Sequence, residues 1–310
     1  MALWVMIDWF SSYTVGFLYM NHSIVSHLSL ASLKGMFLLM RPLQWLKNVF
    51  VLAPLLFSGE FIHYHAVAEA LLAMLFFCFA SSAAYIVNDI YDIEDDRRHL
   101  KKSVTRPLAA GQVSILQAKG LLIVLYCLVL SSWLVFPDVF FILGAYILLN
   151  IAYTIWFKRE PVVDIFMIAF GFVLRVYAGA VALQVPMSSW MFITTFSLAL
   201  YLAAIKRRQE LQNRGTEARE VLKQYSISLV ERYADMSGTA TLIFYSMFVM
   251  AAKPSLVVSI PLVLFGLFRY WYVVDELDGG ESPINVLVED KPLLLTVILW
   301  AVVCCWLLRP

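Results

Sequence analysis

Nine long apolar runs divide this chain, and they constrain its fold more than any other feature. A bilayer core about 30 Å thick is crossed by a helix of roughly 20 apolar residues. Backbone polar groups inside lipid must be satisfied within the segment, and the runs are too continuous for barrel strands, so they predict helices. They lie near residues 34–58, 66–87, 118–136, 139–157, 162–183, 189–205, 236–252, 255–274 and 292–308. We therefore expect an all-α, polytopic membrane protein built as a bundle of nine transmembrane helices.

Composition supports the lipid bilayer as the main surroundings of this chain. Hydrophobic residues make up 62% and charged residues 15% of the 310 residues, against about 45–50% and about 25% in soluble domains. The net charge of +1 gives no overall field that would attract nucleic acid, so we expect no nucleic-acid partner. The four cysteines all lie in apolar runs, and their spacing fits neither a disulfide framework nor a zinc site.

The basic residues are concentrated on one side of the expected bundle. The loops on the opposite side hold only Lys253 and Arg309, whereas the N-terminal segment and the long loops carry most of the 23 basic residues. Excess Lys and Arg mark the cytoplasmic side of a membrane protein. We therefore expect residues 88–117, 206–235 and 275–291 to face the cytoplasm. The protein is then expected in the cell (inner) membrane, with an active-site mouth on the cytoplasmic face.

The first residues differ from the rest of the chain. Residues 1–33 are apolar and rich in aromatics, yet they lack the basic start and the small-residue cleavage site of a signal peptide. We interpret them as a dispensable N-terminal extension, which can be an interfacial helix, a tenth span or translated upstream sequence. Residues 34–310 are expected to form a single catalytic domain. The sequence leaves a homo-oligomer open.

An acidic segment follows the second apolar run and is the most informative motif. Asp89, Asp92 and Asp96 fall within about 60° of one another at 100° per residue, so a continuing helix places three carboxylates on one stripe. Asn88 lies beside them. Carboxylates this close repel strongly at a membrane boundary, and a divalent cation removes the repulsion. Because magnesium prefers one or two carboxylates plus phosphate oxygens and water, we predict Mg²⁺ bound together with a diphosphate. A solvated acidic helix end is the alternative.

Basic residues near the expected mouth form the second part of the site. Lys102 and Arg106 follow the acidic stripe, in the charge pattern expected for polyphosphate substrates. Arg175 lies within an apolar run, where an arginine costs at least ~2.5 kcal/mol on insertion scales. It lies three helical turns after Asp164 on nearly the same face, so we expect it to pair with Asp164 or with an anionic substrate. Further candidates are Lys47, Asn48, Lys158, Lys206 and Arg207.

The longest loop, residues 206–235, combines basic and apolar residues. Its apolar positions over 221–229 indicate an amphipathic helix lying over the cytoplasmic mouth, and its distal charges, including Arg219, are expected to contact anionic lipid. Lys206 and Arg207 lie nearer the bundle and are better candidates for binding phosphate.

These motifs resemble the UbiA-type intramembrane prenyltransferase superfamily, whose members hold magnesium and a diphosphate in a helical bundle. The resemblance rests on nine helices and on the pattern Asn88-Asp89-x-x-Asp92-x-x-x-Asp96, and it covers most of residues 36–308. Further features look like one branch, the decaprenyl-phosphate phosphoribosyltransferase type. They are Arg41-Pro-Leu-Gln-Trp45-Leu-Lys47-Asn48, Tyr153-x-x-x-x-Lys158, Asp164, Phe172-Val-Leu-Arg175-Val-x-Ala-Gly179 and Lys206-Arg207-Arg208-x-Glu210.

The resemblance implies a reaction and the residues that perform it. Relatives of this branch transfer 5-phosphoribose from phosphoribosyl diphosphate to a polyprenyl phosphate, toward lipid-linked arabinofuranose donors. By resemblance, the metal and diphosphate belong to Asp89, Asp92 and Asp96, and the catalytic set adds Lys47 and Lys158. The implied substrate-binding set is Asn48, Asn88, Lys102, Arg106, Tyr153, Asp164, Arg175, Lys206 and Arg207. Here one residue more separates Lys102 from Arg106 than in the relatives, which leaves the partners of these two residues open.

Two other functions stay open. The nearest is a prenyltransferase that uses a polyprenyl diphosphate donor and an aromatic or glycerol-phosphate acceptor. Such enzymes generally carry a second carboxylate-rich motif, and the corresponding stretch from Tyr153 to Asp164 is poor in acids. A different class is a transporter that uses Asp164 and Arg175 as an ion or anion site. The polar motifs gather on one face, which argues against a transport pathway because such a pathway needs access from both sides.

Overall fold

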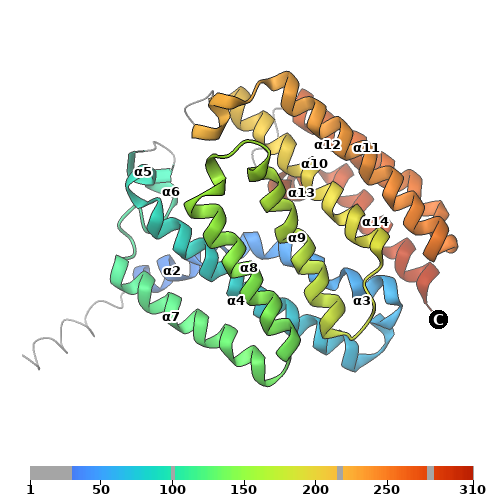
Figure 1. Ribbon diagram of the computed structural model, residues 1–310, viewed down its shortest axis with the longest axis horizontal. Helices are drawn as coiled ribbons and strands as arrows, with labels where there is room; N and C mark the ends of the chain where they lie inside the picture. Colours follow the sequence, from blue (N-terminus) through green and yellow to red (C-terminus); the bar gives the residue numbers. More distant parts are fainter. Residues whose placement is uncertain (1–29, 99–101, 215–218, 278–282, 310) are drawn as a thin grey trace, which may run out of the picture.

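Helices form every regular element of the described chain. The computed structural model describes residues 30–98, 102–214, 219–277 and 283–309, and within these residues no strand occurs (Figure 1). The elements are α2 (Leu30–Leu39), η1 (Pro42–Leu52), α3 (Ala53–Ser58), η2 (Glu60–Ile62), α4 (Tyr64–Tyr91), α5 (Ile93–Arg98), α6 (Lys102–Thr105), α7 (Ile115–Ser131), η3 (Ser132–Leu134), α8 (Pro137–Ile155), η4 (Phe157–Arg159), α9 (Val163–Ala182), α10 (Ser189–Arg214), η6 (Glu220–Gln224), α11 (Ile227–Ala252), η7 (Pro254–Ser259), α12 (Ile260–Glu276), α13 (Pro283–Glu289) and α14 (Lys291–Leu308). The predicted all-α fold is confirmed. Most of the expected extension 1–33 lies outside the described residues.

Seven helices of the described chain are long and apolar enough to cross a membrane. They are α4, α7 with η3, α8, α9, α10, η7 with α12, and α14. α11 covers the expected run 236–252, but it begins earlier, in a stretch that carries Glu231, Arg232 and Asp235. The chain is therefore a multi-pass membrane protein, and the expected count of nine spans is compatible with this arrangement.

The first expected span, 34–58, is not one straight helix, and that prediction is wrong. The chain breaks at Arg41, whose φ of 54° is left-handed, and Pro42 then opens η1, a 3₁₀ helix of 11 residues. A residue before proline is disfavoured in the helical region, and proline suits the first position of a new helix, so the break is encoded locally. The hydroxyl of Ser82 donates to the carbonyl oxygen of Met40 at 2.8 Å and ties the break to α4.

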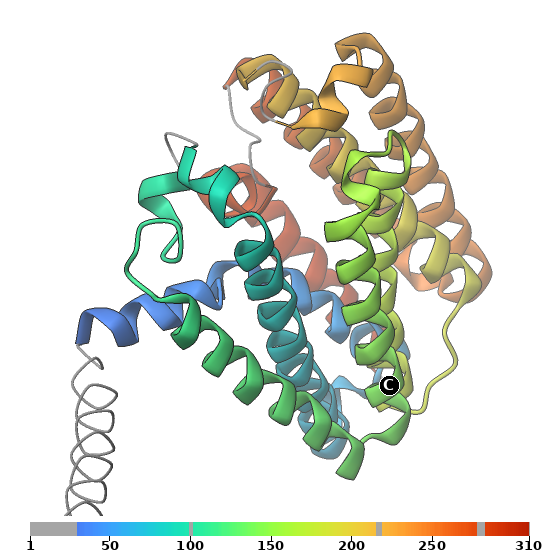
Figure 2. The same cartoon turned by 60° about the vertical axis from the view of Figure 1, so that its left-hand side comes forward.

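η1 lies unusually close to α9, which runs through the middle of the bundle between α8 and α10 (Figures 1 and 2). A Cβ atom at Gly179 would lie 1.8 Å from the carbonyl oxygen of Val51, so only glycine permits this approach. Small residues commonly let helix backbones approach in membrane proteins. This close approach of Val51 to Gly179 fixes the position of η1, and with it the residues that η1 presents to the interior.

Two helices extend further than their apolar runs. α4 continues to Tyr91, so Asn88 and Asp89 belong to its last turns, and α10 continues to Arg214. We had expected Lys206 and Arg207 to lie in a loop, but they lie on α10. Hydropathy marks where a helix leaves lipid and not where it ends, which explains the error.

The expected amphipathic helix over 221–229 is also wrong. η6 covers Glu220–Gln224, Tyr225 and Ser226 follow with extended backbones, and α11 then begins at Ile227. Val221 and Leu222 are fully buried in a core formed with α10, α11 and α12. The segment is thus held in the protein core and does not lie on lipid.

Candidate active site

One cavity of about 1130 Å³ gathers the charged residues of the chain's motifs. Eleven of the fourteen predicted site residues line it: Lys47, Asn88, Asp92, Asp96, Lys102, Arg106, Tyr153, Lys158, Arg175, Lys206 and Arg207. Apolar and aromatic residues also line the cavity, among them Phe57, Phe248, Leu262, Val263 and Trp300. The cavity therefore combines a highly charged wall with apolar side chains.

Arg106 bridges two of the three predicted aspartates. Its guanidinium donates to Asp89 at 2.9 Å and also to Asp96, and both carboxylates are only 2% exposed. Arg41 donates to Asp89 as well, and the ammonium of Lys102 lies 3.3 Å from Asp96. Burial lowers the pKa of Lys102, whereas the nearby Asp96 carboxylate opposes that shift. These contacts settle the partners of Lys102 and Arg106, and they show that Asp89 itself is enclosed behind the cavity wall.

Asp92 turns toward a different partner. The ammonium of Lys158, from η4, donates to Asp92 at 2.5 Å and lies 4.8 Å from the ring centroid of Tyr91. Beside it, the hydroxyl of Thr154 donates to the Asn88 side-chain oxygen at 3.2 Å. The acidic stripe is thus pinned between α6 on one side and the end of α8 on the other.

The predicted metal ligands Asp89, Asp92 and Asp96 do not come together around one position in the part of the chain that the structure describes. In the described residues, no group of three or more His, Cys, Asp or Glu side chains is arranged to hold a metal ion. Asp92 and Asp96 nevertheless both line the cavity, with Asn88 beside them and cations around them. Magnesium takes one or two carboxylates and completes its shell with phosphate oxygens and water. This donor set therefore fits magnesium that binds together with a diphosphate.

Arg175 is buried without a carboxylate. Its guanidinium donates to Asn48 at 2.9 Å, to the Tyr146 hydroxyl at 2.9 Å and to the carbonyl oxygen of Gly171 at 2.7 Å. The rings of Phe77, Tyr146 and Phe172 surround it at 4.8–5.2 Å. No acid within the described residues forms an ion pair with it. The expected pairing with Asp164 is absent, and Asn48, itself fully buried, positions the arginine instead.

Asp164 belongs to a separate buried network. It accepts from Arg207 at 2.6 Å and from the Tyr225 hydroxyl at 2.8 Å. Burial raises the pKa of Tyr225, so this hydroxyl remains a donor. Arg207 also donates to Glu210 at 2.7 Å and to the Tyr153 hydroxyl at 3.2 Å. Asp164 pairs with Arg207 of the neighbouring helix α10. Residue spacing within α9 cannot reveal a partner on another helix.

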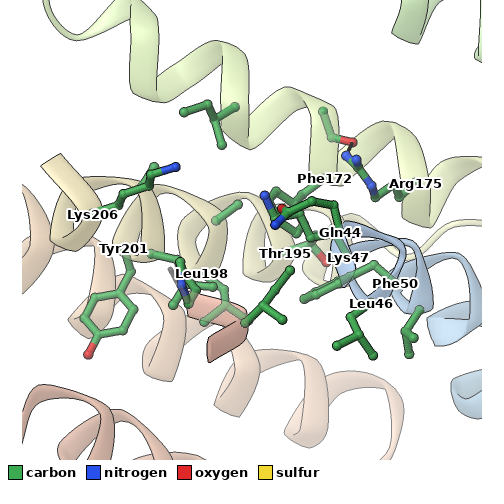
Figure 3. A pocket seen from close by; sticks show the side chains of 18 of the residues that line it. Gln44, Leu46, Lys47, Phe50, Phe172, Arg175, Thr195, Leu198, Tyr201 and Lys206 are labelled. Atoms are coloured by element: carbon green, nitrogen blue, oxygen red, sulfur yellow. Dashed lines mark hydrogen bonds between the residues drawn. The ribbon is translucent and has the colours of Figure 1, made fainter. Parts of the chain in front are cut away.

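Two lysines complete the inner wall. Lys47 of η1 forms no ion pair within the described chain, and Lys206 of α10 has its nearest carboxylate, Glu210, at 4.0 Å. Figure 3 shows these lysines and Arg175 on elements that enclose the same space. The inner wall is therefore rich in cations whose charge the protein leaves largely uncompensated.

Arg219 is a site residue that the sequence did not reveal. It lines the cavity, and its guanidinium lies 3.1 Å from Glu210 and donates to the Tyr153 hydroxyl at 3.4 Å. The expectation that it contacts lipid is thus wrong. The sequence signal for this position was the adjacent apolar pair Val221 and Leu222, which packs in the core beside Arg219.

Comparison with known proteins agrees with this arrangement. A sequence model of the UbiA prenyltransferase family matches residues 48–286. Decaprenyl-phosphate phosphoribosyltransferase of Corynebacterium glutamicum is 32% identical over 281 residues, 86% of this chain and 84% of that protein. The protein of the same name from Mycolicibacterium smegmatis is 32% identical over 288 residues, 86% of this chain and 90% of that protein.

A solved structure supports the fold. A UbiA homolog from Archaeoglobus fulgidus, bound to DMAPP and Mg²⁺, aligns with a TM-score of 0.69 at 20% identity, and the match covers 87% of this chain and 97% of that one. The resemblance inferred from the acidic motif is thereby confirmed. The chain belongs to the UbiA prenyltransferase family.

Proposed function

We propose that this protein catalyses magnesium-dependent transfer of 5-phosphoribose from phosphoribosyl diphosphate to a polyprenyl phosphate, with release of diphosphate. The observation that carries the proposal is the cavity, in which a carboxylate-rich wall, uncompensated cations and apolar side chains occur together. Such a cavity suits two anionic substrates, one of which has a lipid tail. The names of the relatives from Corynebacterium glutamicum and Mycolicibacterium smegmatis, each aligned over most of both chains, support the same reaction.

The donor belongs at the carboxylate wall. Asp92 and Asp96, with Asn88, would hold the magnesium–diphosphate group, while Asp89 positions Arg41 and Arg106 from behind. Bound magnesium would neutralise the charge that develops on the departing diphosphate. The cations that now pair with the carboxylates are within reach of the same phosphates, because they line the same cavity.

The acceptor needs little activation. A lipid phosphate is already an anionic nucleophile, so its oxygen can form the new bond to the ribosyl carbon without a strong general base. The bond from that carbon to diphosphate breaks, and the carbon gains oxocarbenium character in the transition state. Displacement inverts the anomeric centre. Lys47, Lys158, Arg175, Lys206 and Arg207 then act by positioning the reactants and balancing charge.

The charge distribution also supports a location. Basic residues gather at the end of the bundle where the carboxylates lie, which by the positive-inside rule is the cytoplasmic side of the cell (inner) membrane. A water-soluble phosphoribosyl diphosphate would enter from there, and the isoprenoid tail would remain in the apolar part of the cavity and the adjoining lipid.

A transfer assay tests this function. Purified protein in lipid is incubated with phosphoribosyl diphosphate labelled in the ribose and with decaprenyl phosphate, and the lipid fraction is counted. We expect label in lipid, its loss after chelation with EDTA and its return with Mg²⁺. If label never enters lipid, the proposal is wrong. Transfer from a polyprenyl diphosphate to an aromatic or glycerol-phosphate acceptor, or magnesium-independent uptake of an ion, would identify the rival functions.

A further inference from the structure

The 3₁₀ geometry of η1 selects the residues that face the cavity. With three residues per turn, side chains at i and i+3 eclipse one another, so Gln44, Lys47 and Phe50 stand in one row. All three line the cavity, as do Leu46, Val49 and Leu52 of the neighbouring apolar row, and Figure 3 shows Gln44, Lys47 and Phe50 on η1 near the residues of α9 and α10 that line it. An α-helix would bring Asn48 and Val51 toward this face, whereas here both are fully buried behind it.

The row changes in chemistry along its length. Gln44 carries an amide with two donors, Lys47 adds a cation without a carboxylate partner in the described chain, and Phe50 contacts Phe172 edge-to-face at 5.1 Å. Six residues of 3₁₀ helix span roughly 12 Å, against roughly 9 Å in an α-helix. Within that length, the cavity wall passes from polar to aromatic.

We propose that this row binds the lipid acceptor: Gln44 and Lys47 bind the monophosphate of a polyprenyl phosphate, and Phe50 contacts its first isoprene unit. The inference rests on the proposed function and assigns a place to one of its two substrates. Arg175 lies on the same inner wall and adds a second cation for the phosphate.

Charge separates this site from that of the donor. The cations near Asp89, Asp92 and Asp96 are already paired with carboxylates, which would repel a lone monophosphate. The inner wall offers uncompensated positive charge and lies beside apolar side chains that a tail requires. The row on η1 provides a phosphate ligand and an isoprene contact in sequence.

A pair of opposite charge changes tests the row. In purified protein in detergent, binding of farnesyl phosphate is measured for Gln44→Glu and Gln44→Lys, and the KM of phosphoribosyl diphosphate is measured in the transfer assay. We expect Gln44→Glu to weaken farnesyl phosphate at least about tenfold because a carboxylate repels the phosphate, and Gln44→Lys to bind it as tightly or more tightly. The KM of phosphoribosyl diphosphate should change less than about twofold. A structural role alone would shift both variants in the same direction.

Matched variants complete the test. The same two changes at Gln112, which is exposed and away from the cavity, should leave farnesyl phosphate binding unaltered. Phe50→Leu should weaken farnesyl phosphate but not inorganic phosphate, since it touches only the tail. Unchanged farnesyl phosphate binding in Gln44→Glu, or a rise confined to the KM of phosphoribosyl diphosphate, overturns the assignment. If the wild-type protein transfers no ribose, the proposed function fails, while direct binding of farnesyl phosphate still decides this site.

Discussion

Arg175 and Arg207 are two almost fully buried arginines in neighbouring helices, and they differ in what balances their charge. Arg207 is 1% exposed and donates to Asp164 and Glu210. Arg175 is 4% exposed and is held by neutral groups, Asn48 among them, with no acid paired to it in the described chain. A buried charge without a counter-charge costs stability. The difference indicates that the charge of Arg207 is balanced within the protein, whereas the charge of Arg175 is left for an anion that comes from outside.

Replacing each arginine by methionine tests this comparison most directly. Arg207→Met leaves Asp164 buried without its cation, and loss of one partner of a buried pair costs about 3–5 kcal/mol. Arg175→Met should cost less, about 1–3 kcal/mol, because its guanidinium donates only to uncharged acceptors, and its loss leaves no carboxylate without a cation. Thermal unfolding in detergent measures both.

Arg159→Met is the control for this pair, since Arg159 and Glu220 are both more than half exposed at their side chains. The cost there should stay below about 1 kcal/mol. Equal destabilisation by Arg175→Met and Arg207→Met would contradict the distinction between the two arginines.

The carboxylate wall extends the comparison to pairs that substrate can exchange. Asp92→Asn should lower transfer by roughly 100-fold, because it removes a ligand for the magnesium–diphosphate group. Its effect on thermal unfolding should be small, since Asp92 is partly exposed and Lys158 can turn to solvent. Glu94→Gln, at an exposed pair with Arg97, should leave transfer intact. An Asp92→Asn protein with normal activity would remove this wall from the mechanism.

The close approach of η1 to α9 allows the position of η1 to be tested without a change of charge. Gly179→Ala forces a Cβ against the backbone of Val51, which cannot move as a side chain would, so we expect about 1–3 kcal/mol of destabilisation. Transfer should fall as well, because η1 carries Lys47. Gly144→Ala has open space around its Cβ and serves as the control. Unaltered unfolding of the Gly179→Ala protein would mean that the close approach is not required.

Arg219 is expected to give the smallest effect. It is one-third exposed and already shared between Glu210 and Tyr153, so Arg219→Ala should raise the KM of phosphoribosyl diphosphate only a few-fold, about 3- to 10-fold. Steady-state kinetics at saturating lipid acceptor measures this change. Lys223→Ala, at an exposed position away from the cavity, should have no effect. A loss of equal size at Lys223 would favour a general effect of surface charge.

Sequence patterns predicted most spans and the residue types of the site, and the physical reason is simple. Bilayer thickness sets the length of an apolar run, and a charge within such a run must have a function or a partner. This reasoning located Lys47, Arg175 and the acidic segment. It failed at Arg41, where a left-handed residue before a proline divides the first run.

The ion-pair and hydrogen-bond partners of the site residues were harder to predict than the site residues themselves. Asp164 and Arg175 share a face of α9, but the partner of Asp164 arrives from α10, and such a contact depends on how the helices pack. The 3₁₀ form of η1 was likewise hidden, since its composition fits an α-helix equally well. Arg219 looked like any other basic residue of a loop, because its two contacts come from other helices.

The different compensation of the two walls has a consequence for how salt affects capture of substrate. The carboxylates and cations of the carboxylate wall cancel one another, so they project little field into solution for dissolved ions to screen. The uncompensated charge of Arg175 is instead buried among aromatic rings, where mobile ions enter poorly and screening is weak. Attraction of an anion should therefore act at short range, after entry, and should persist at ionic strengths that abolish steering at an exposed basic surface.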